Sequence, residues 1–285
     1  MRVSFGSRRS VVALGAAVGA ALLSACSKEA TACRPSLAVA AGAPFSATGA
    51  DCAAVPALPA SQPFALSGTV TYDFVRSVYD ASTETGGLDF AGATPRPVRG
   101  AAVEIRQCDN VIGTATTDEL GRYAATFTPG PTGRIYVAAL ARTADPPIRV
   151  RDNTDGTLWA VAAPLDSASA TLDLHATHGW NGCAYGPWRI AAPFAILDDV
   201  YTAERALLAV RDVPFASPVT VNWSPKNYPS TAYAPASGAI RISHYDLATS
   251  EIFVLGAEGI DTDEFDRAAI VHEWSHFFDY TFSRS

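Results

Sequence analysis

Two histidines near the C-terminal end of the sequence have the spacing of a metal-binding pair. His272 and His276 enclose Glu273 in a His-Glu-x-x-His pattern. On an α-helix, residues i and i+4 lie on one face a turn apart, so both imidazoles can reach a single ion. Glu273 is rotated by about 100° from His272, which brings its carboxylate beside that ion. The pattern predicts a zinc site with His272 and His276 as ligands.

The residue types define the chemistry of such a site. Zinc binds neutral imidazole and keeps an open position for water in catalytic sites, and it lowers the pKa of that water to about 7. A neighbouring carboxylate can take the proton of the water and pass it to a leaving amine. We therefore expect Zn²⁺ as the cofactor, Glu273 as the general base and a peptide bond as the target of hydrolysis.

The flanking residues predict the helix that carries the motif. Asp261 and Glu264 have the D-x-x-E spacing of a capping box at a helix start. Large apolar residues occur around the histidines, namely Phe265, Ile270, Trp274, Phe277 and Phe278. One interpretation is an amphipathic core helix with two polar histidines. The other is a metal site, which we favour because histidines on a buried face need a partner.

The identity of a third protein ligand stays open at this point. A catalytic zinc site normally has three, and the motif supplies two. Asp279 lies seven residues beyond His272 and hence nearly on the same face, and His244 is expected at the end of a strand. The sequence ends nine residues after His276. A glutamate downstream of Ser285 is the third candidate.

Length and charge limit the classes of protein to which this chain can belong. Its 285 residues are enough for two domains with cores of their own. The formal net charge is −7, which disfavours a polyanionic partner, so we expect no nucleic acid ligand. The candidate partners are a peptide or protein substrate and, through the N-terminus, a membrane.

The N-terminus has the features of an export signal. Positive charges at Arg2, Arg8 and Arg9 precede an apolar run over residues 11–22, and Leu23-Ser24-Ala25-Cys26 follows. The apolar run is too short for a membrane-spanning helix. The segment resembles a bacterial lipoprotein signal, which implies removal of residues 1–25, lipidation of Cys26 and a place in the cell envelope, at the outer membrane or the cell surface.

Four further cysteines occur in the exported chain: Cys33, Cys52, Cys108 and Cys183. An oxidising compartment permits disulfides between them. Of the three possible pairings, Cys33–Cys52 together with Cys108–Cys183 needs the least rearrangement. Buried free thiols are the alternative.

The middle of the chain predicts a β-sandwich. Residues 26–62 are rich in Ala, Ser, Pro and Gly and are expected to form a flexible linker. Short alternating strands with turns between them then point to an all-β sandwich over residues 63–142. Strands are expected over 64–74, 102–106, 111–116, 122–128 and 134–141, with a loop through Gly86-Gly87 and 95–97. Residues 143–190 form a β-rich connection, in which 152–156 are expected to turn and His175 and His178 to be structural.

Three segments of this sandwich resemble the carboxypeptidase regulatory-like, transthyretin-like domain. They are residues 67–70, residues 98–105 and Thr117-Asp118-Glu119-Leu120-Gly121-Arg122-Tyr123. The resemblance implies that Asp118 closes a turn in which Gly121 takes a positive φ. It implies a fold and no catalytic function.

Residues 191–285 contain a helix opened by Pro193, mixed strands over 219–223, 239–244 and 251–255, and then the metal helix. This order resembles the N-terminal α+β half of a zincin domain, in which an edge strand holds extended substrate. The chain is similar to bacterial zinc-metallopeptidase-like lipoproteins, and a gluzincin-type third ligand would come from a later helix. The resemblance implies a membrane-anchored zinc peptidase with a truncated catalytic domain. The alternative is a non-catalytic cell-surface binding lipoprotein with a degenerate zincin domain.

Overall fold

The computed structural model describes residues 49–82, 84–166, 168–210, 215 and 218–283. The predicted signal peptide, Cys26 and Cys33 lie outside these residues. The described part is a mixed α/β fold dominated by strands in two main sheets, and its α-helices are α2 (Gly49–Ala53), α3 (Ala191–Val210) and α4 (Arg267–Phe282). None of the described helices is long and apolar enough to cross a membrane.

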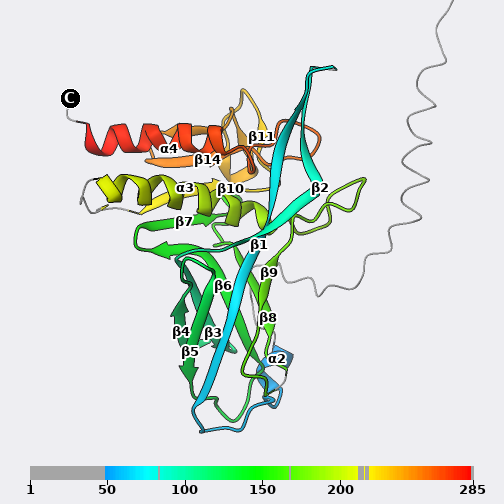
Figure 1. Ribbon diagram of the computed structural model, residues 1–285, viewed down its shortest axis with the longest axis vertical. Coiled ribbons are helices and arrows are strands. Elements are labelled where there is room, and N and C mark those ends of the chain that lie inside the picture. The colour runs from blue at the N-terminus through cyan, green and yellow to red at the C-terminus, as the bar shows by residue number, and fades with distance from the viewer. Residues whose placement is uncertain (1–48, 83, 167, 211–214, 216–217, 284–285) are drawn as a thin grey trace, which may run out of the picture.

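The first sheet is four-stranded and is built around one long strand. β1 (Phe64–Asp80) pairs antiparallel with β5 (Arg122–Phe127) along its first part and with β2 (Thr85–Pro97) along the rest. The short strand β9 (Leu174–Ala176) joins β1 in parallel. Figure 1 shows the distal end of the β1–β2 hairpin projecting beyond the rest of the sheet.

The second sheet is eight-stranded and runs from one part of the molecule into the other. Its order is β13 (His244–Asp246), β14 (Glu251–Val254), β10 (Val219–Trp223), β7 (Pro147–Arg151), β6 (Ile135–Ala144), β3 (Ala101–Gln107) and β4 (Asn110–Thr116), with β8 (Ala160–Pro164) also on β6. A separate pair consists of β11 (Tyr228–Pro229) and β12 (Ala239–Ile240). Three strands of the predicted sandwich, β3, β4 and β6, therefore belong to the same continuous sheet as the strands beside the His-Glu-x-x-His motif.

At one end of the molecule the two sheets face each other. Strand β3 alternates strictly between buried and half-buried side chains, and β5 between exposed and buried ones. This period of two places one face of each strand on the core. Val103, Ile105, Tyr123 and Val137 are all at most 3% exposed there. The alternation predicted these strands, and the structure confirms them with ends that differ by a few residues.

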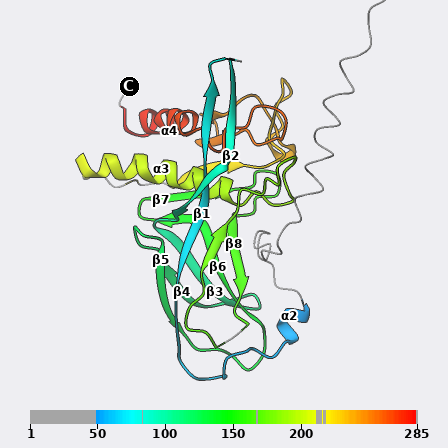
Figure 2. The ribbon, with the colours of Figure 1, turned by 45° about the vertical axis from the view of Figure 1, so that its right-hand side comes forward.

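At the other end, helices cover the sheet. All five residues of β10 are buried, and β10 pairs in parallel with both β7 and β14. Its sequence Val-Thr-Val-Asn-Trp alternates apolar and polar residues, and the polar face is buried as well, because Thr220 and Asn222 accept hydrogen bonds from Arg149 and Arg151 (both 2.8 Å). Figure 2 shows α3 lying between α4 and the strand β7. The core of this end is continuous with that of the sandwich, so α4 rests on a packed base.

The predicted turn of the sandwich is confirmed. Asp118 accepts hydrogen bonds from the backbone N–H groups of Leu120 and Arg122, both at 2.9 Å. Gly121 has a φ of +74°, and a Cβ at this position would lie 2.5 Å from the carbonyl oxygen of Val70. Only glycine fits such a conformation and such a close approach.

Three expectations from the sequence were wrong. Residues 239–244, expected as one strand, are divided between β12 and β13, which belong to different sheets, and residues 241–243 belong to neither strand. Residues 85–97, expected as a loop because of their Gly and Pro content, form β2. This strand is at the edge of its sheet, and Pro95 and Pro97 occupy alternate positions of its ladder, where an edge strand tolerates proline. Residues 49–62, assigned to the flexible linker, contain α2 and the buried Leu58. The turn at 152–156 is present, closed by a hydrogen bond from Gly156 N to Asp152 O.

Candidate metal centre

Helix α4 begins later than its sequence suggested. Its N-cap is Asp266, whose carboxylate accepts hydrogen bonds from the N–H groups of Ala268 (2.9 Å) and Ala269 (3.1 Å). The capping box predicted from Asp261 and Glu264 is therefore wrong. Glu264 is instead fully buried and forms an ion pair with Arg189. Glu264 pairs with Arg189 because a buried carboxylate needs a cationic partner.

The buried stripe of α4 excludes the two histidines. Ile270, Trp274 and Phe277 are the buried residues of the helix. His272 and His276 are two positions before and after Trp274, on the opposite side of the helix, and both are exposed. The sequence-based expectation of a buried histidine face was wrong in this respect. The apolar residues fix the helix on the sheet, and the histidines face a solvent-accessible groove.

The two imidazoles converge. The Nε2 atoms of His272 and His276 lie 3.2 Å apart, and the rings are nearly perpendicular with their centroids at 4.7 Å. Two nitrogens bound at 2.0–2.1 Å to one tetrahedral ion stand about 3.3 Å apart. The separation in this structure is thus already that of two ligands of one zinc ion.

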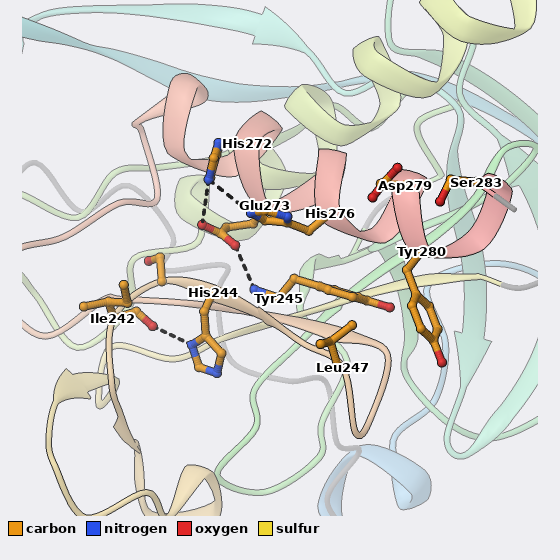
Figure 3. Close-up of a pocket in the computed structure, with 11 residues that line it drawn as sticks. Ile242, His244, Tyr245, Leu247, His272, Glu273, His276, Asp279, Tyr280 and Ser283 are labelled. Atoms are coloured by element: carbon orange, nitrogen blue, oxygen red, sulfur yellow. Dashed lines mark hydrogen bonds and ion pairs between the residues drawn. The ribbon is translucent and has the colours of Figure 1, made fainter. Parts of the chain in front are cut away.

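Glu273 is held in place by the edge strand. Its Oε2 accepts a hydrogen bond from the backbone N–H of Tyr245 (2.8 Å), in β13. Its Oε1 lies 4.0 Å from His272 Nε2, and the side chain is 13% exposed. Figure 3 shows Glu273 between the histidine pair above it and the strand below. One carboxylate oxygen is therefore anchored while the other faces the pair.

The groove between α4 and β13 is a pocket of about 660 Å³. Helix α4 contributes His272, Glu273, His276, Asp279 and Tyr280, and the facing strand segment contributes Ile242, Ser243, His244, Tyr245 and Leu247. β13 is the last strand of the eight-stranded sheet. An extended chain placed in this groove would lie along a sheet edge and beside the histidine pair.

Neither local candidate for a third ligand reaches the pair. His244 is stacked on Phe253 and interacts through Nδ1 with the carbonyl of Ile242 (2.6 Å) and through Nε2 with the hydroxyl of Tyr233 (3.3 Å). Figure 3 shows its ring turned away from α4 and the Asp279 carboxylate directed away from the histidines. Among the described residues, no three His, Cys, Asp or Glu side chains are grouped so that they could hold a metal.

The loop that leads into α4 is held by buried polar contacts. Arg189 pairs with Glu264, and its guanidinium also donates to the carbonyl of Gly256. Ser243 donates to Asp263 and accepts a hydrogen bond from Leu255 N (2.9 Å). Burial raises the pKa of the Asp263 carboxyl above its ordinary value, although the Ser243 hydroxyl opposes this. These contacts fix the start of β13 relative to the helix.

The other two predicted histidines lie far along the chain from this groove, beside β1. His175 bridges Thr71 Oγ1 (2.8 Å from Nδ1) and Asp73 Oδ1 (2.9 Å from Nε2). The hydrogen bond to Asp73 raises the pKa of His175, whereas burial lowers that of His178. The backbone N–H of His178 also donates to Asp73. Both histidines thus hold the connecting region on β1, as expected for structural residues.

Comparisons with known proteins return no match, whether with protein-family models, curated proteins or solved structures. The geometry of the groove is therefore the only guide to function. Sequence reasoning missed one residue of this geometry, Tyr245, because it was assigned to a loop. A three-residue strand gives too short an alternation to be recognised.

Proposed function

We propose that this protein is a zinc-dependent peptidase of the cell envelope, with His272 and His276 as zinc ligands. The observation that carries the proposal is the 3.2 Å separation of the two Nε2 atoms, with a glutamate oxygen 4.0 Å from one of them. A hydrogen bond between two neutral imidazoles also accounts for that separation. It does not account for the carboxylate held beside the pair or for the adjoining groove.

In this proposal, zinc, Glu273 and the backbone of Tyr245 have separate roles in peptide hydrolysis. Zinc bound at the pair would supply a Lewis acid that polarises a substrate carbonyl. Glu273 takes a proton from the attacking water and passes it to the leaving amine. The Tyr245 N–H fixes one oxygen of this carboxylate, so the proton is accepted at Oε1, which faces the histidines. Fixing the base in advance lowers the entropic part of the barrier.

The arrangement of strands supports a peptide as the substrate. Edge strands bind extended peptides by adding a further strand to the sheet. β13 lies antiparallel to β14 at the sheet edge and borders the groove directly. We propose on this basis that residues 191–285 correspond to the N-terminal half of a zincin domain. We also propose that residues 63–142 are a transthyretin-like sandwich, with the protein anchored through a lipid on Cys26.

A second function is favoured by one observation. The described residues bring together two metal ligands and no third, and a catalytic zinc site normally has three. The rival proposal is therefore a non-catalytic surface lipoprotein, in which the sandwich binds protein or glycan and the groove is degenerate.

An assay of peptide hydrolysis by the wild-type protein separates the two proposals. The peptidase proposal expects hydrolysis that a zinc chelator abolishes and added zinc restores. Glu273→Gln should retain zinc and lose hydrolysis, because the amide keeps the shape of the side chain but cannot accept the proton. Retained zinc without hydrolysis in the wild type would favour the binding protein. A Glu273→Gln variant as fast as the wild type would exclude Glu273 as the base.

A further inference from the structure

The end of the molecule opposite α4 carries two cysteines from distant parts of the sequence. Cys52 belongs to α2, and Cys108 lies in the turn between β3 and β4. Both views of the ribbon place α2 and α4 at opposite ends of the long axis (Figures 1 and 2). Both thiols are free and half-buried in the structure, and Cys108 is the neighbour that raises the pKa of the Cys52 thiol most strongly.

Helix α2 is fixed to the sandwich by contacts on both sides of Cys52. The carbonyl of Asp51 accepts a hydrogen bond from Arg134 N (2.8 Å), and that of Ala54 from Gly133 N (2.7 Å). The Asp51 carboxylate accepts another from the Tyr136 hydroxyl (2.8 Å). The position of Cys52 is therefore set by its neighbours in the chain and does not depend on its own thiol.

Cys108 is directed toward the same loop. A Cβ on Gly133 would lie 2.8 Å from Cys108 Sγ, so the sulfur lies directly against the glycine that binds α2. The preceding Gln107 locks the turn to this loop, because its amide donates to the carbonyls of Gly130 (3.2 Å) and Gly133 (2.9 Å). Two independent sets of hydrogen bonds thus bring Cys52 and Cys108 together.

We propose that Cys52 and Cys108 form a disulfide in the exported protein. Formation requires a disulfide oxidant, such as an exported thiol–disulfide oxidoreductase or oxidised glutathione. One protein thiolate attacks the oxidant and releases its first thiol, and the second protein thiolate then attacks the mixed disulfide and releases the other. Two protein thiols are oxidised, and one disulfide of the oxidant is reduced to two thiols.

This pairing differs from the one expected from the sequence, Cys33–Cys52 together with Cys108–Cys183. In that pairing Cys52 joins Cys33, which lies outside the described residues, and Cys108 joins Cys183. The structure places Cys183 in a separate turn, where its N–H donates to the Asn181 side chain (3.0 Å). Two thiols held next to each other are expected to be oxidised in an oxidising compartment.

The bond would fix where the N-terminal segment leaves the folded unit. If Cys26 carries the lipid anchor, as proposed above, the anchor leaves from the end of the sandwich that is farthest from the histidine pair. The sandwich would then separate the groove from the membrane surface. This consequence depends on the proposed anchor, whereas the disulfide itself does not.

Peptide mapping of the exported, unreduced protein tests the pairing. After alkylation of free thiols, cleavage before aspartate separates the cysteines into residues 26–50, 51–72, 89–108 and 173–197. We expect 51–72 linked to 89–108, with the linked mass lost on reduction and retained in Cys33→Ser. A link from residues 26–50 to either peptide would overturn the proposal, as would alkylated Cys52 and Cys108 in protein exposed to oxidised glutathione.

Thermal unfolding provides a second test that does not depend on peptide recovery. Cys52→Ser, Cys108→Ser and the double variant should all lower the melting temperature by the same amount, since each removes the same bond. Reductant should lower the melting temperature of the wild type to that of the variants and should not change the melting temperature of the double variant. Additive losses in the single variants, or a wild type that is insensitive to reductant, would contradict a disulfide.

Discussion

Glu204 couples the packing of helix α4 to pH. It projects from α3, is 0% exposed, and its Oε1 accepts a hydrogen bond from Trp274 Nε1 (3.3 Å). Its Oε2 has no hydrogen-bond partner in the described part of the chain. Burial raises the pKa of this carboxyl from 4.5 to about 8, and the Trp274 bond offsets only part of the effect. The folded protein therefore holds Glu204 protonated near neutral pH.

The pKa of Glu204 determines the sign and size of the effect. Between pH 4.5 and about 8 the unfolded chain releases the proton while the folded state retains it, so the free energy of unfolding falls as the pH rises. Each pKa unit corresponds to about 1.4 kcal/mol. We expect the free energy of unfolding to fall by roughly 3 kcal/mol between pH 5 and pH 8 because of this group alone. A change of this size is a large fraction of the total stability of a typical protein.

The assay is urea denaturation of wild type and Glu204→Gln at pH 5 and pH 8. Glutamine keeps the acceptor for Trp274 and does not titrate, so the variant should lose less stability than the wild type over this range. Asp199, whose pKa burial raises to about 7, acts in the same sense in both proteins. The difference between their pH dependences therefore isolates Glu204. Equal pH dependences would refute the buried neutral glutamate and the α3–α4 packing that requires it.

Two further predictions concern the loop before α4 and the N-terminus. Arg189→Leu should lower the free energy of unfolding by about 3–5 kcal/mol, because it leaves Glu264 buried and uncompensated. In urea denaturation, the double variant Arg189→Leu with Glu264→Leu should recover part of this loss. An equal loss in the single and the double variant would contradict the ion-pair account. Cys26→Ser should release the protein from membranes in a fractionation experiment. Equal solubility of wild type and variant would exclude the lipid anchor.

Strong local signals made much of the fold predictable. Alternating apolar and polar residues located β3, β5 and β10, the last with its observed ends. β2 was not predictable, because its glycines and prolines oppose strand formation locally and only pairing with β1 overcomes that preference. Strand β7 alternates over only five residues, with Ile148 and Val150 buried and Arg149 exposed between them. The prolines at its start and the turn at 152–156 after it favour a loop locally.

The candidate site was predictable in the parts that depend on helix geometry. The spacing of His272 and His276 fixes their shared face whatever surrounds the helix. Their exposure was not predictable, because it depends on which stripe of α4 contacts the sheet. The contact between Glu273 and Tyr245 joins residues 28 positions apart through the sheet edge, and local sequence patterns contain no information on such a contact.

Zinc binding by the histidine pair is the central claim, and X-ray absorption at the zinc edge tests it most directly. The zinc-loaded protein should show two imidazole nitrogens at about 2.0–2.1 Å, with light ligands completing the shell. His272→Ala and His276→Ala should each abolish stoichiometric zinc, whereas His244→Ala should not change the spectrum. Failure to bind zinc, or a spectrum with imidazole ligands that persists in both His272→Ala and His276→Ala, would contradict the account.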